Sequence, residues 1–455
     1  MIISKNPFTN SILQQFNEYT PEKIDAVLEN SQHAFNLQKQ RTFQERSALL
    51  TATADILESN KEAYAKLITQ EMGKLYTESL SEVEKCAWVC RYYADRGPGF
   101  LMDVLVNTDA SLSKVTYQPL GAILGVMPWN FPFWQVFRFA APTLMAGNIC
   151  LLKHASNVPQ SALLIQEVFE KAGWPEGSFQ SILVKSSFVS TLIKDDRVKA
   201  VTLTGSGPAG KAVAATAGEH LKKCVLELGG SDPYIILGDA DIQEAAKICA
   251  KGRMLNAGQS CIGAKRFIAV RDVYDEFLNA FRKEMEAYVP GDPMIKSTNL
   301  APLASKELRD DLHNQVLESV AKGCHLLTGG YLPEISDSSF YPPTILTEIT
   351  RDSPAYSQEL FGPVASVFRV ENEEEAIHLA NDTNFGLGAA IFSGNVVRAE
   401  EIATQKIEAG NVFINAQVKS DPRLPFGGIK TSGYGRELSR EGILEFVNIK
   451  TIYRK

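Results

Sequence analysis

The chain has 455 residues, of which 45% are hydrophobic and 22% charged, and its formal net charge is −7. This is the composition of a globular protein, and because single hydrophobic cores stop growing at roughly 250–300 residues, we expect two large domains. No segment is dense in Lys or Arg, which argues against nucleic acid as a partner. No apolar run reaches the roughly 18 residues that a membrane helix needs, so we expect no membrane contact.

The first residues, MIISKNPFTNSILQQF, lack the basic region and unbroken apolar core of a signal peptide. The seven cysteines are odd in number and scattered along the chain, so we expect reduced thiols and a cytoplasmic protein. Cys86 and Cys90 lie four residues apart with no histidine beside them, and the six histidines are isolated. We therefore expect no metal site.

In chain order, residues 21–93 show helical spacing of apolar residues, which the segment DRGPGF at 95–100 is expected to end. Residues 114–127 alternate and predict two strands around a Pro-Leu-Gly turn. From about 120 to 228, short apolar runs alternate with helical segments, which is typical of a parallel sheet with helices on both faces. The predicted strands are AILGVM, ICLLK, SILV, AVTLT and KCVLELGG.

A second alternation begins at residue 233 and predicts a second α/β domain. Its strands are PYIIL, RFIAV, HLLTGG, PVASVFRV and NVFIN. The last stretch, GILEFVNIKTIYRK, is predicted to be the end of a helix followed by a strand. The exposed β-branched edge of that strand suits pairing with another subunit.

A glycine motif, G-x-G-x-x-G at Gly205, Gly207 and Gly210, lies between a predicted strand and a predicted helix. Such glycines let backbone amides approach a pyrophosphate at a helix N-terminus, although strand-to-helix glycine turns are also common without a ligand. About 20 residues further on, Glu227 ends the next strand. It fits either a ribose clamp or a general base, and spacing alone does not decide between them.

Three further segments supply groups for one site. Asn130 lies in the proline-stiffened turn PWNFP and offers an amide for a developing oxyanion. Glu227 offers a base, and Cys261, in the polar run NAGQSCIGAKRF, offers a nucleophile. Each also has a simpler interpretation: Asn130 closes a turn, Glu227 is a surface carboxylate, and Cys261 packs under a loop.

Taken together, the segments resemble the aldehyde dehydrogenase superfamily along nearly the whole chain. The matching segments are PWNFP, NICLLKHAS, TLTGSGPAGKAV, LELGGSDP, NAGQSCIGAKR, QELFGPV, INAQ and LPFGGIKTSGYGRE. The resemblance implies an α/β fold of two doubly wound parallel-sheet domains with a small β oligomerisation extension. It implies Cys261 as nucleophile, Glu227 as general base rather than ribose clamp, and Asn130 with the Cys261 amide as the oxyanion hole.

The resemblance also implies the residues that bind an NAD or NADP cofactor. Lys153 matches a lysine at the ribose, and Ser206 matches a serine at the pyrophosphate. The other matching positions are Trp129, Gly205, Glu359 and Phe361. Ser156 stands where strongly NAD-selective members have a glutamate, and because a carboxylate there repels a 2′-phosphate, we expect NADP to be used at least as well as NAD. The segment ILVKSSFVSTLI departs from the family by lacking its usual glycine pair.

Arg138, Ser420 and Phe426 are the predicted substrate-binding residues. Arg138 stands where succinate-semialdehyde dehydrogenases carry an arginine for the distal carboxylate of the substrate, which a guanidinium binds bidentately. The sequence most resembles the compact bacterial branch of those enzymes. Their second arginine is Leu255 here, with Arg253 nearby. The alternative is that Arg138 forms a structural ion pair.

The predicted function is therefore oxidation of an aldehyde, succinate semialdehyde first, with glutarate semialdehyde and aliphatic aldehydes as alternatives. A thiol-dependent acyl hydrolase and a dinucleotide-binding protein with a silent site are the other classes considered. We expect a dinucleotide-binding domain at 1–228, with 114–126 in an oligomerisation extension, and a catalytic domain at 229–424. Residues 425–455 are expected to return to the cofactor domain and end in an oligomerisation strand, in a homodimer or homotetramer.

Overall fold

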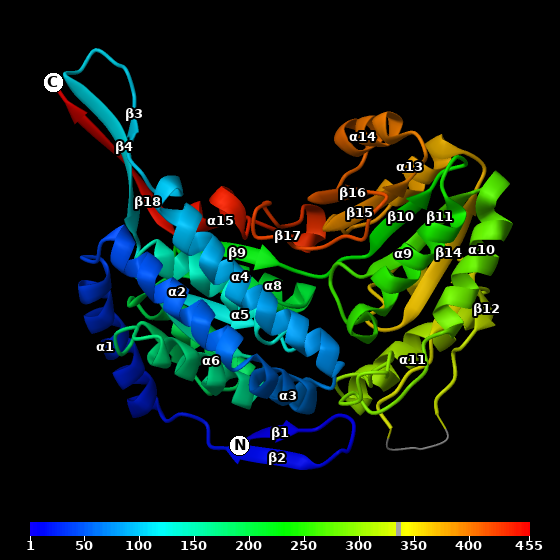
Figure 1. The fold of residues 1–455 in the computed structure, drawn as a ribbon, viewed down its shortest axis with the longest axis horizontal. Coiled ribbons are helices and arrows are strands. Elements are labelled where there is room, and N and C mark those ends of the chain that lie inside the picture. Colours follow the sequence, from blue (N-terminus) through cyan, green and yellow to red (C-terminus); the bar gives the residue numbers. More distant parts are fainter. Residues whose placement is uncertain (334–337) are drawn as a thin grey trace.

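Two mainly parallel sheets organise the computed structural model, which describes residues 1–333 and 338–455 (Figure 1). The chain starts with a hairpin, β1 (Ile2–Lys5) and β2 (Ile12–Phe16), followed by four helices. These helices are α1 (Pro21–Gln38), α2 (Phe43–Ser59), α3 (Lys61–Met72) and α4 (Tyr76–Phe100). The Thr20 hydroxyl caps α1, and Thr42 with Glu45 forms a capping box on α2, so polar side chains fix where both helices begin.

The predicted helix end at residues 95–100 is wrong, because α4 continues through Gly97 and Pro98 to Phe100. Gly97 is buried, and a Cβ atom added to it would lie 2.5 Å from the Met145 side chain. Glycine here allows α4 to pack closely on the next helix, and this packing overrides the low helix propensity of Gly and Pro.

The first sheet has the strand order β17-β9-β8-β5-β6-β7, with β17 antiparallel to the rest. Ile123 and Leu124, adjacent in β5, pack into the two different hydrophobic cores on opposite faces, as parallel strands with helices on both sides require. Four of the five predicted strands are confirmed, whereas the strand predicted for SILV lies earlier in the chain, at Phe179–Ser181, and shares only Ser181 with the prediction. The strands are β5 (Ala122–Met127), β6 (Ile149–His154), β7 (Phe179–Ser181), β8 (Val198–Thr204), β9 (Lys223–Glu227) and β17 (Gly433–Tyr434). Their helices are α5 (Trp134–Met145), α6 (Pro159–Lys171), α7 (Val189–Lys194) and α8 (Gly207–Glu219).

The second sheet has the order β12-β13-β14-β11-β10-β15-β16, with only β12 antiparallel among the described strands. The sequence analysis did not predict two of its strands, β13 and β15. The strands are β10 (Asp232–Ile236), β11 (Ala264–Val270), β12 (His325–Thr328), β13 (Thr344–Thr347), β14 (Val364–Val370), β15 (Gly388–Phe392) and β16 (Asn411–Ile414). The helices are α9 (Ile242–Met254), α10 (Arg271–Glu286), α11 (Lys306–Ala321), α12 (Pro354–Ser357), α13 (Glu373–Asn381) and α14 (Val396–Gln405).

A three-stranded arm projects from the first lobe (Figure 1). It consists of β3 (Val104–Leu105), β4 (Leu112–Pro119) and β18 (Val447–Arg454). The short helix α15 (Ser439–Leu444) directly precedes β18 in the chain. β18 pairs along its whole length with β4, so the end of the chain is fastened to its first third. Ile449 and Tyr453 of β18 are more than half exposed.

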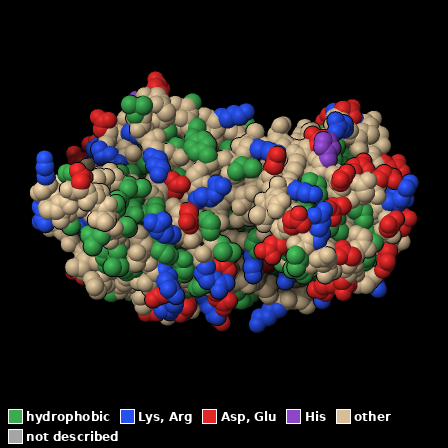
Figure 2. Space-filling model, turned by 90° about the horizontal axis from the view of Figure 1, so that it is seen from above, with side chains coloured by type: hydrophobic (Ala, Val, Ile, Leu, Met, Phe, Trp, Pro, Cys, Tyr) green, Lys and Arg blue, Asp and Glu red, His purple; other side chains and the backbone are tan. Residues whose placement is uncertain are grey.

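The face of the molecule in Figure 2 carries basic and acidic side chains in a mixture, without a continuous basic patch. Acidic side chains are most frequent over the lobe of the second sheet. Within the described residues, no helix is both long enough and apolar enough to cross a bilayer. The same part of the chain contains no group of three or more His, Cys, Asp or Glu side chains that could hold a metal ion.

Candidate active site

A cavity of about 360 Å³ lies between α4, α5, the Cys261 loop and the segment after β16. It brings together four residues that the sequence predicted for one site: Cys261, Arg138, Ser420 and Phe426. Lys85 of α4 also lines it and was not predicted. The cavity walls expose mostly apolar surface with a few convergent polar groups, which is the usual character of a small-molecule site.

The loop that carries Cys261 begins with three residues in the left-handed backbone region. The φ angles of Asn256, Ala257 and Gly258 are 54°, 50° and 77°. For the two non-glycine residues this conformation costs energy and persists only where the surroundings hold it. Here the buried Glu78 carboxylate accepts from the Asn256 amide at 2.8 Å, and the Arg253 guanidinium donates to the Gly258 carbonyl at 2.5 Å. The loop is therefore fixed from both sides.

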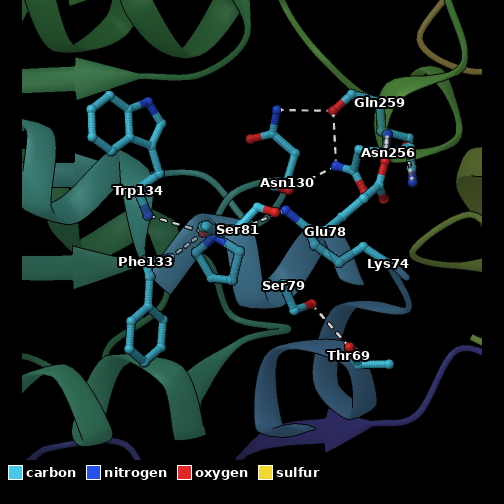
Figure 3. A network of polar contacts seen from close by, with 12 residues as sticks. Thr69, Lys74, Glu78, Ser79, Ser81, Asn130, Phe133, Trp134, Asn256 and Gln259 are labelled. Carbon is cyan, nitrogen blue, oxygen red and sulfur yellow. Dashed lines mark hydrogen bonds and ion pairs between the residues drawn. The ribbon is translucent and has the colours of Figure 1, made fainter. Parts of the chain in front are cut away.

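Asn130 is part of the same polar network (Figure 3). Its amide nitrogen donates to the Gln259 carbonyl at 3.1 Å, and its backbone carbonyl accepts from the Asn256 side chain at 2.8 Å. The Asn130 side-chain oxygen is buried and has no partner. The network ties the PWNFP turn to the nucleophile loop and leaves the second amide hydrogen of Asn130 for another acceptor.

A buried ion pair between Lys74 and Glu82 holds the PWNFP turn and the start of α5 in place. Glu82 accepts from the Phe133 and Trp134 amides at the start of α5, at 2.8 and 3.0 Å. Its other oxygen accepts from Lys74 at 2.5 Å, and the Lys74 ammonium lies 3.7 Å from the Phe131 ring centroid. Both charged side chains are essentially without solvent contact, so the position of α5 depends on this pair.

We expect Lys74→Met to lower the free energy of unfolding by about 3–5 kcal/mol, because it leaves the Glu82 charge buried and unpaired. The midpoints of thermal and urea unfolding would measure the loss. Lys66→Met, which removes an exposed lysine from α3, is the matched control and should leave the midpoints almost unchanged. Equal midpoints for the two variants would contradict the role given to the Lys74–Glu82 pair.

Cys261 lies at the pocket wall. Burial raises its pKa to about 11, against the opposing effects of the nearby cations Arg138 and Lys265. The Lys265 ammonium donates to the backbone carbonyls of Ser260 and Cys261 at 2.9 and 2.8 Å and pairs with Glu359 at 3.1 Å. At neutral pH, ionisation of the thiol therefore needs a base or a further positive charge.

Glu227 ends β9 with both carboxylate oxygens buried and without hydrogen-bond partners. Burial, and then the nearby Glu437 carboxylate, raise its pKa well above the ordinary value, while Arg138 and Arg436 act in the opposite direction. A Cβ atom added to Gly427 would lie 2.7 Å from Glu227 Oε1, so this glycine makes room for the carboxylate. A carboxylate with a raised pKa is better suited to accept a proton near neutral pH.

The residues predicted to bind a cofactor gather at the carboxyl ends of the first sheet's strands. Trp129 follows β5, Lys153 is in β6, and Gly205 with Ser206 follows β8. The chain adds β6 and β7 on one side of β5 and β8 on the other, so the strand order reverses between β5 and β8. In open α/β sheets, ligands bind in the crevice at this point.

The local geometry of this crevice fits a dinucleotide. Helix α8 begins at Gly207, and the first amides of a helix can bind an anion such as a diphosphate. The Lys153 ammonium donates to Ser186 at 3.2 Å, and Ser156 is exposed. On the side of the second sheet, the Phe361 ring stands edge-on to Trp129 at 5.9 Å. Glu359 accepts from the Gly230 amide at 3.2 Å.

Arg138 both lines the pocket and forms a structural ion pair. Its guanidinium pairs with Glu437, donates to the Thr204 hydroxyl at 3.3 Å and lies 4.7 Å from the Phe426 ring centroid. Only 2% of its surface is exposed. Arg253 does not line the cavity, because it is buried and turned toward Gly258.

The sequence analysis missed four charged residues of the site: Glu78, Glu82, Lys85 and Glu437. Glu437 stood within the quoted segment LPFGGIKTSGYGRE but was not singled out. The other three lie on α4, where a helical pattern alone gave no reason to separate buried charges from exposed ones. A charged residue on the apolar face of a predicted helix was the signal that could have indicated these buried charges.

The fold and the site define an enzyme of the aldehyde dehydrogenase family, to which the chain belongs. The profile described as "Aldehyde dehydrogenase family" matches residues 1–452, which confirms the family predicted from the motifs. A protein of Synechocystis named "Probable succinate-semialdehyde dehydrogenase [NADP(+)]" is 51% identical over 452 residues, 99% of each chain. "Succinate-semialdehyde dehydrogenase [NADP(+)] 1" of Mycobacterium ulcerans is 46% identical over 456 residues, also 99% of each chain.

The solved structures agree. Succinic semialdehyde dehydrogenase from Streptococcus pyogenes, in complex with NADP+, has a TM-score of 0.97 and 42% identity, covering 100% of this chain and 99% of that one. The structure described for cofactor and substrate selection by Gox0499 has a TM-score of 0.98 and 41% identity, covering both chains fully. The predicted fold class is confirmed. None of these relatives is named as a hydrolase, so the acyl-hydrolase alternative has no support.

Proposed function

We propose that this enzyme oxidises succinate semialdehyde to succinate with NADP as its preferred cofactor and NAD as a tolerated one. The observation that carries the proposal is the pocket, which has the Cys261 thiol on its wall and a cationic, hydrogen-bonding group around Ser420 elsewhere in the same cavity. A substrate with an aldehyde at one end and a carboxylate at the other suits such a pocket. The names of the relatives that align along the whole chain support the same substrate.

In the proposed mechanism the Cys261 thiol first loses its proton to water, and the thiolate then attacks the aldehyde carbon to form the anion of a thiohemiacetal. The Asn130 amide and the Cys261 backbone N–H hold the oxyanion, which is a typical stabilisation for this intermediate. When bound, the cofactor would supply the acceptor for the hydride of the former aldehyde carbon, which would leave a thioester on Cys261. Glu227 then takes a proton from water, whose oxygen attacks the thioester carbon. As the carbon–sulfur bond breaks and the carboxylic acid leaves, Glu227 returns the proton to the Cys261 sulfur.

The NADP preference is argued from the charges at the β6 end of the crevice. Lys153 supplies a positive charge there, and Ser156 is an exposed hydroxyl three residues further on. A 2′-phosphate is attracted by the lysine and meets no carboxylate at residue 156. The groups proposed to hold the rest of the cofactor are Trp129, Gly205, Ser206, Glu359 and Phe361.

We assign dinucleotide binding to residues 1–228 together with 425–455, because these build the first sheet, and catalysis to 229–424. The exposed Ile449 and Tyr453 of β18 and the exposed Leu105 of β3 support a homodimer or a homotetramer built through the arm. The seven cysteines are all free, which favours a reducing compartment and hence the cytoplasm.

Initial rates of cofactor reduction test this function. Succinate semialdehyde and butanal, each with NADP and with NAD, give four values of kcat/KM. We expect the highest value for succinate semialdehyde with NADP. Equal or better use of butanal would contradict the proposed substrate while leaving the family unaffected, and glutarate semialdehyde in the same assay would detect a longer acid.

A further inference from the structure

Lys85 is a half-buried cation without an ion-pair partner among the described residues, and it lines the substrate pocket. It projects from the inner side of α4, and its ammonium lies 4.1 Å from the Trp134 ring centroid. It donates to the Ser420 hydroxyl at 2.8 Å. Lys85 forms no ion pair within the described residues, whereas the buried cations Lys74 and Arg138 pair with carboxylates. A desolvated charge in this state attracts an anion strongly.

Arg138, the cation that the sequence favoured, is in a different electrostatic state. Its guanidinium is already paired with Glu437 and is held on its other side by Thr204. Most of its charge is therefore compensated inside the protein. Of these two cations, Lys85 brings the less compensated charge to the cavity; a third cation, Lys419, also lines the cavity but is exposed to solvent.

Ser420 has its acceptor capacity filled. Its oxygen accepts from the Lys85 ammonium at 2.8 Å and from the Trp134 indole N–H at 3.1 Å. A hydroxyl has two lone pairs and one proton, so the Ser420 proton is what remains for a ligand. Lys85 likewise keeps two of its three N–H donors. Together the two side chains offer several donors and no acceptor, which selects a carboxylate over a neutral group.

We propose that Lys85, acting with Ser420, is the residue that binds the distal carboxylate of the substrate and so determines its specificity. This inference rests on the proposed function and deepens it, since it moves recognition of the acid from Arg138 to Lys85. Arg138 remains a wall of the pocket and a neighbour of Glu227 and Phe426.

The electrostatics around Lys85 support the same assignment. Burial, and then the positive charge of Arg138 on α5, lower the Lys85 pKa to about 8. The groups that act the other way are Cys86 and Glu82 on its own helix and Asp421 beyond Ser420. A carboxylate bound beside the ammonium stabilises the charged form. Binding of the acid therefore weakens as the pH rises through about 8 and the ammonium loses its proton.

The test compares Lys85→Met with Lys85→Arg and Lys419→Met. The first variant keeps the length of the side chain and removes its charge, and the second keeps the charge. The third removes the charge of Lys419, the exposed lysine of the same cavity and the rival cation for the acid. The readout is the ratio of kcat/KM for succinate semialdehyde to that for butanal, together with the separate KM and kcat values. For Lys85→Met we expect the ratio to fall by about 10- to 100-fold, mainly through KM of the acid, as for other hydrogen bonds to charged groups.

Lys85→Arg should keep most of the ratio, and Lys419→Met should lower it much less than Lys85→Met does, because water screens an exposed charge. An unchanged ratio in Lys85→Met, or an equal fall in Lys419→Met, would overturn the proposal. Because each comparison starts from the wild-type ratio, a wild type without preference for the acid contradicts the proposed function instead. The wild-type enzyme gives an independent check: KM for the acid should rise above about pH 8 relative to KM for butanal, and parallel curves would also overturn the proposal.

Discussion

Replacement of Cys261 by alanine is expected to reduce aldehyde oxidation by at least about 10⁴-fold, as the loss of a nucleophile does in other covalent mechanisms. Dinucleotide binding should survive, because the cofactor crevice lies at the strand ends of the first sheet, and fluorescence titration with NADPH would measure it. Cys324→Ala is the control, since this cysteine is buried beside β12 outside the described pocket. Normal oxidation by Cys261→Ala would remove the thiol from the mechanism.

The same cysteine predicts a pH dependence that is measured without substrate. With its pKa raised to about 11 by burial, Cys261 is almost fully protonated at neutral pH. Alkylation by iodoacetamide, which needs the thiolate, should therefore accelerate about tenfold for each pH unit up to about 10. A plateau near pH 7 would show that the resting enzyme already holds a thiolate.

Glu227→Gln is expected to slow turnover by about 10²- to 10⁴-fold, the range for loss of a general base. The glutamine is nearly the same size and fits the space beside Gly427, but it does not accept the proton from water. Because hydride transfer precedes hydrolysis, mixing enzyme, cofactor and aldehyde should still give a burst of one reduced cofactor per site. Rapid-mixing absorbance and detection of the acyl-enzyme by intact mass would record both events.

The Glu227→Gln variant also separates the two interpretations that the sequence left open. A ribose clamp predicts that the variant loses NADP affinity and shows no burst. A general base predicts unchanged affinity, a burst and an accumulated thioester. The matched control is Glu219→Gln, which makes the same change at the exposed end of α8.

Much of the fold followed from periodicity because its strands are short, β-branched and separated by helices of ordinary length. The missed strands have a local reason. β13 is a four-residue strand directly after Pro342 and Pro343, and β15 begins with Gly388 and two alanines, which lack the β-branched signal. The helix α4 was cut short in the prediction because its Gly97 is explained only by contact with Met145, a neighbour that no local pattern names.

The site was predictable where function sits in motifs and unpredictable where it depends on pairing. Cys261 and Asn130 stand in short distinctive segments. The state of Arg138 depends on Glu437, which is 299 residues away in the chain. The charge of Lys85 matters because of Ser420, a contact across 335 residues. A single sequence lists these residues but does not show which carboxylate neutralises which cation.

The pairing of β17 with β9 and of β18 with β4 has a consequence for how the enzyme comes into being. Glu227 and Cys261 leave the ribosome long before Phe426, which lines the pocket, and Glu437, which pairs with the pocket residue Arg138. During synthesis the nucleophile therefore exists without its full enclosure, and the reactive chamber forms only when the final segment returns to the first sheet. Such late, long-range closure is slow compared with local folding. Nascent enzyme should accordingly acquire activity in a single step, after its last 30 or so residues have emerged.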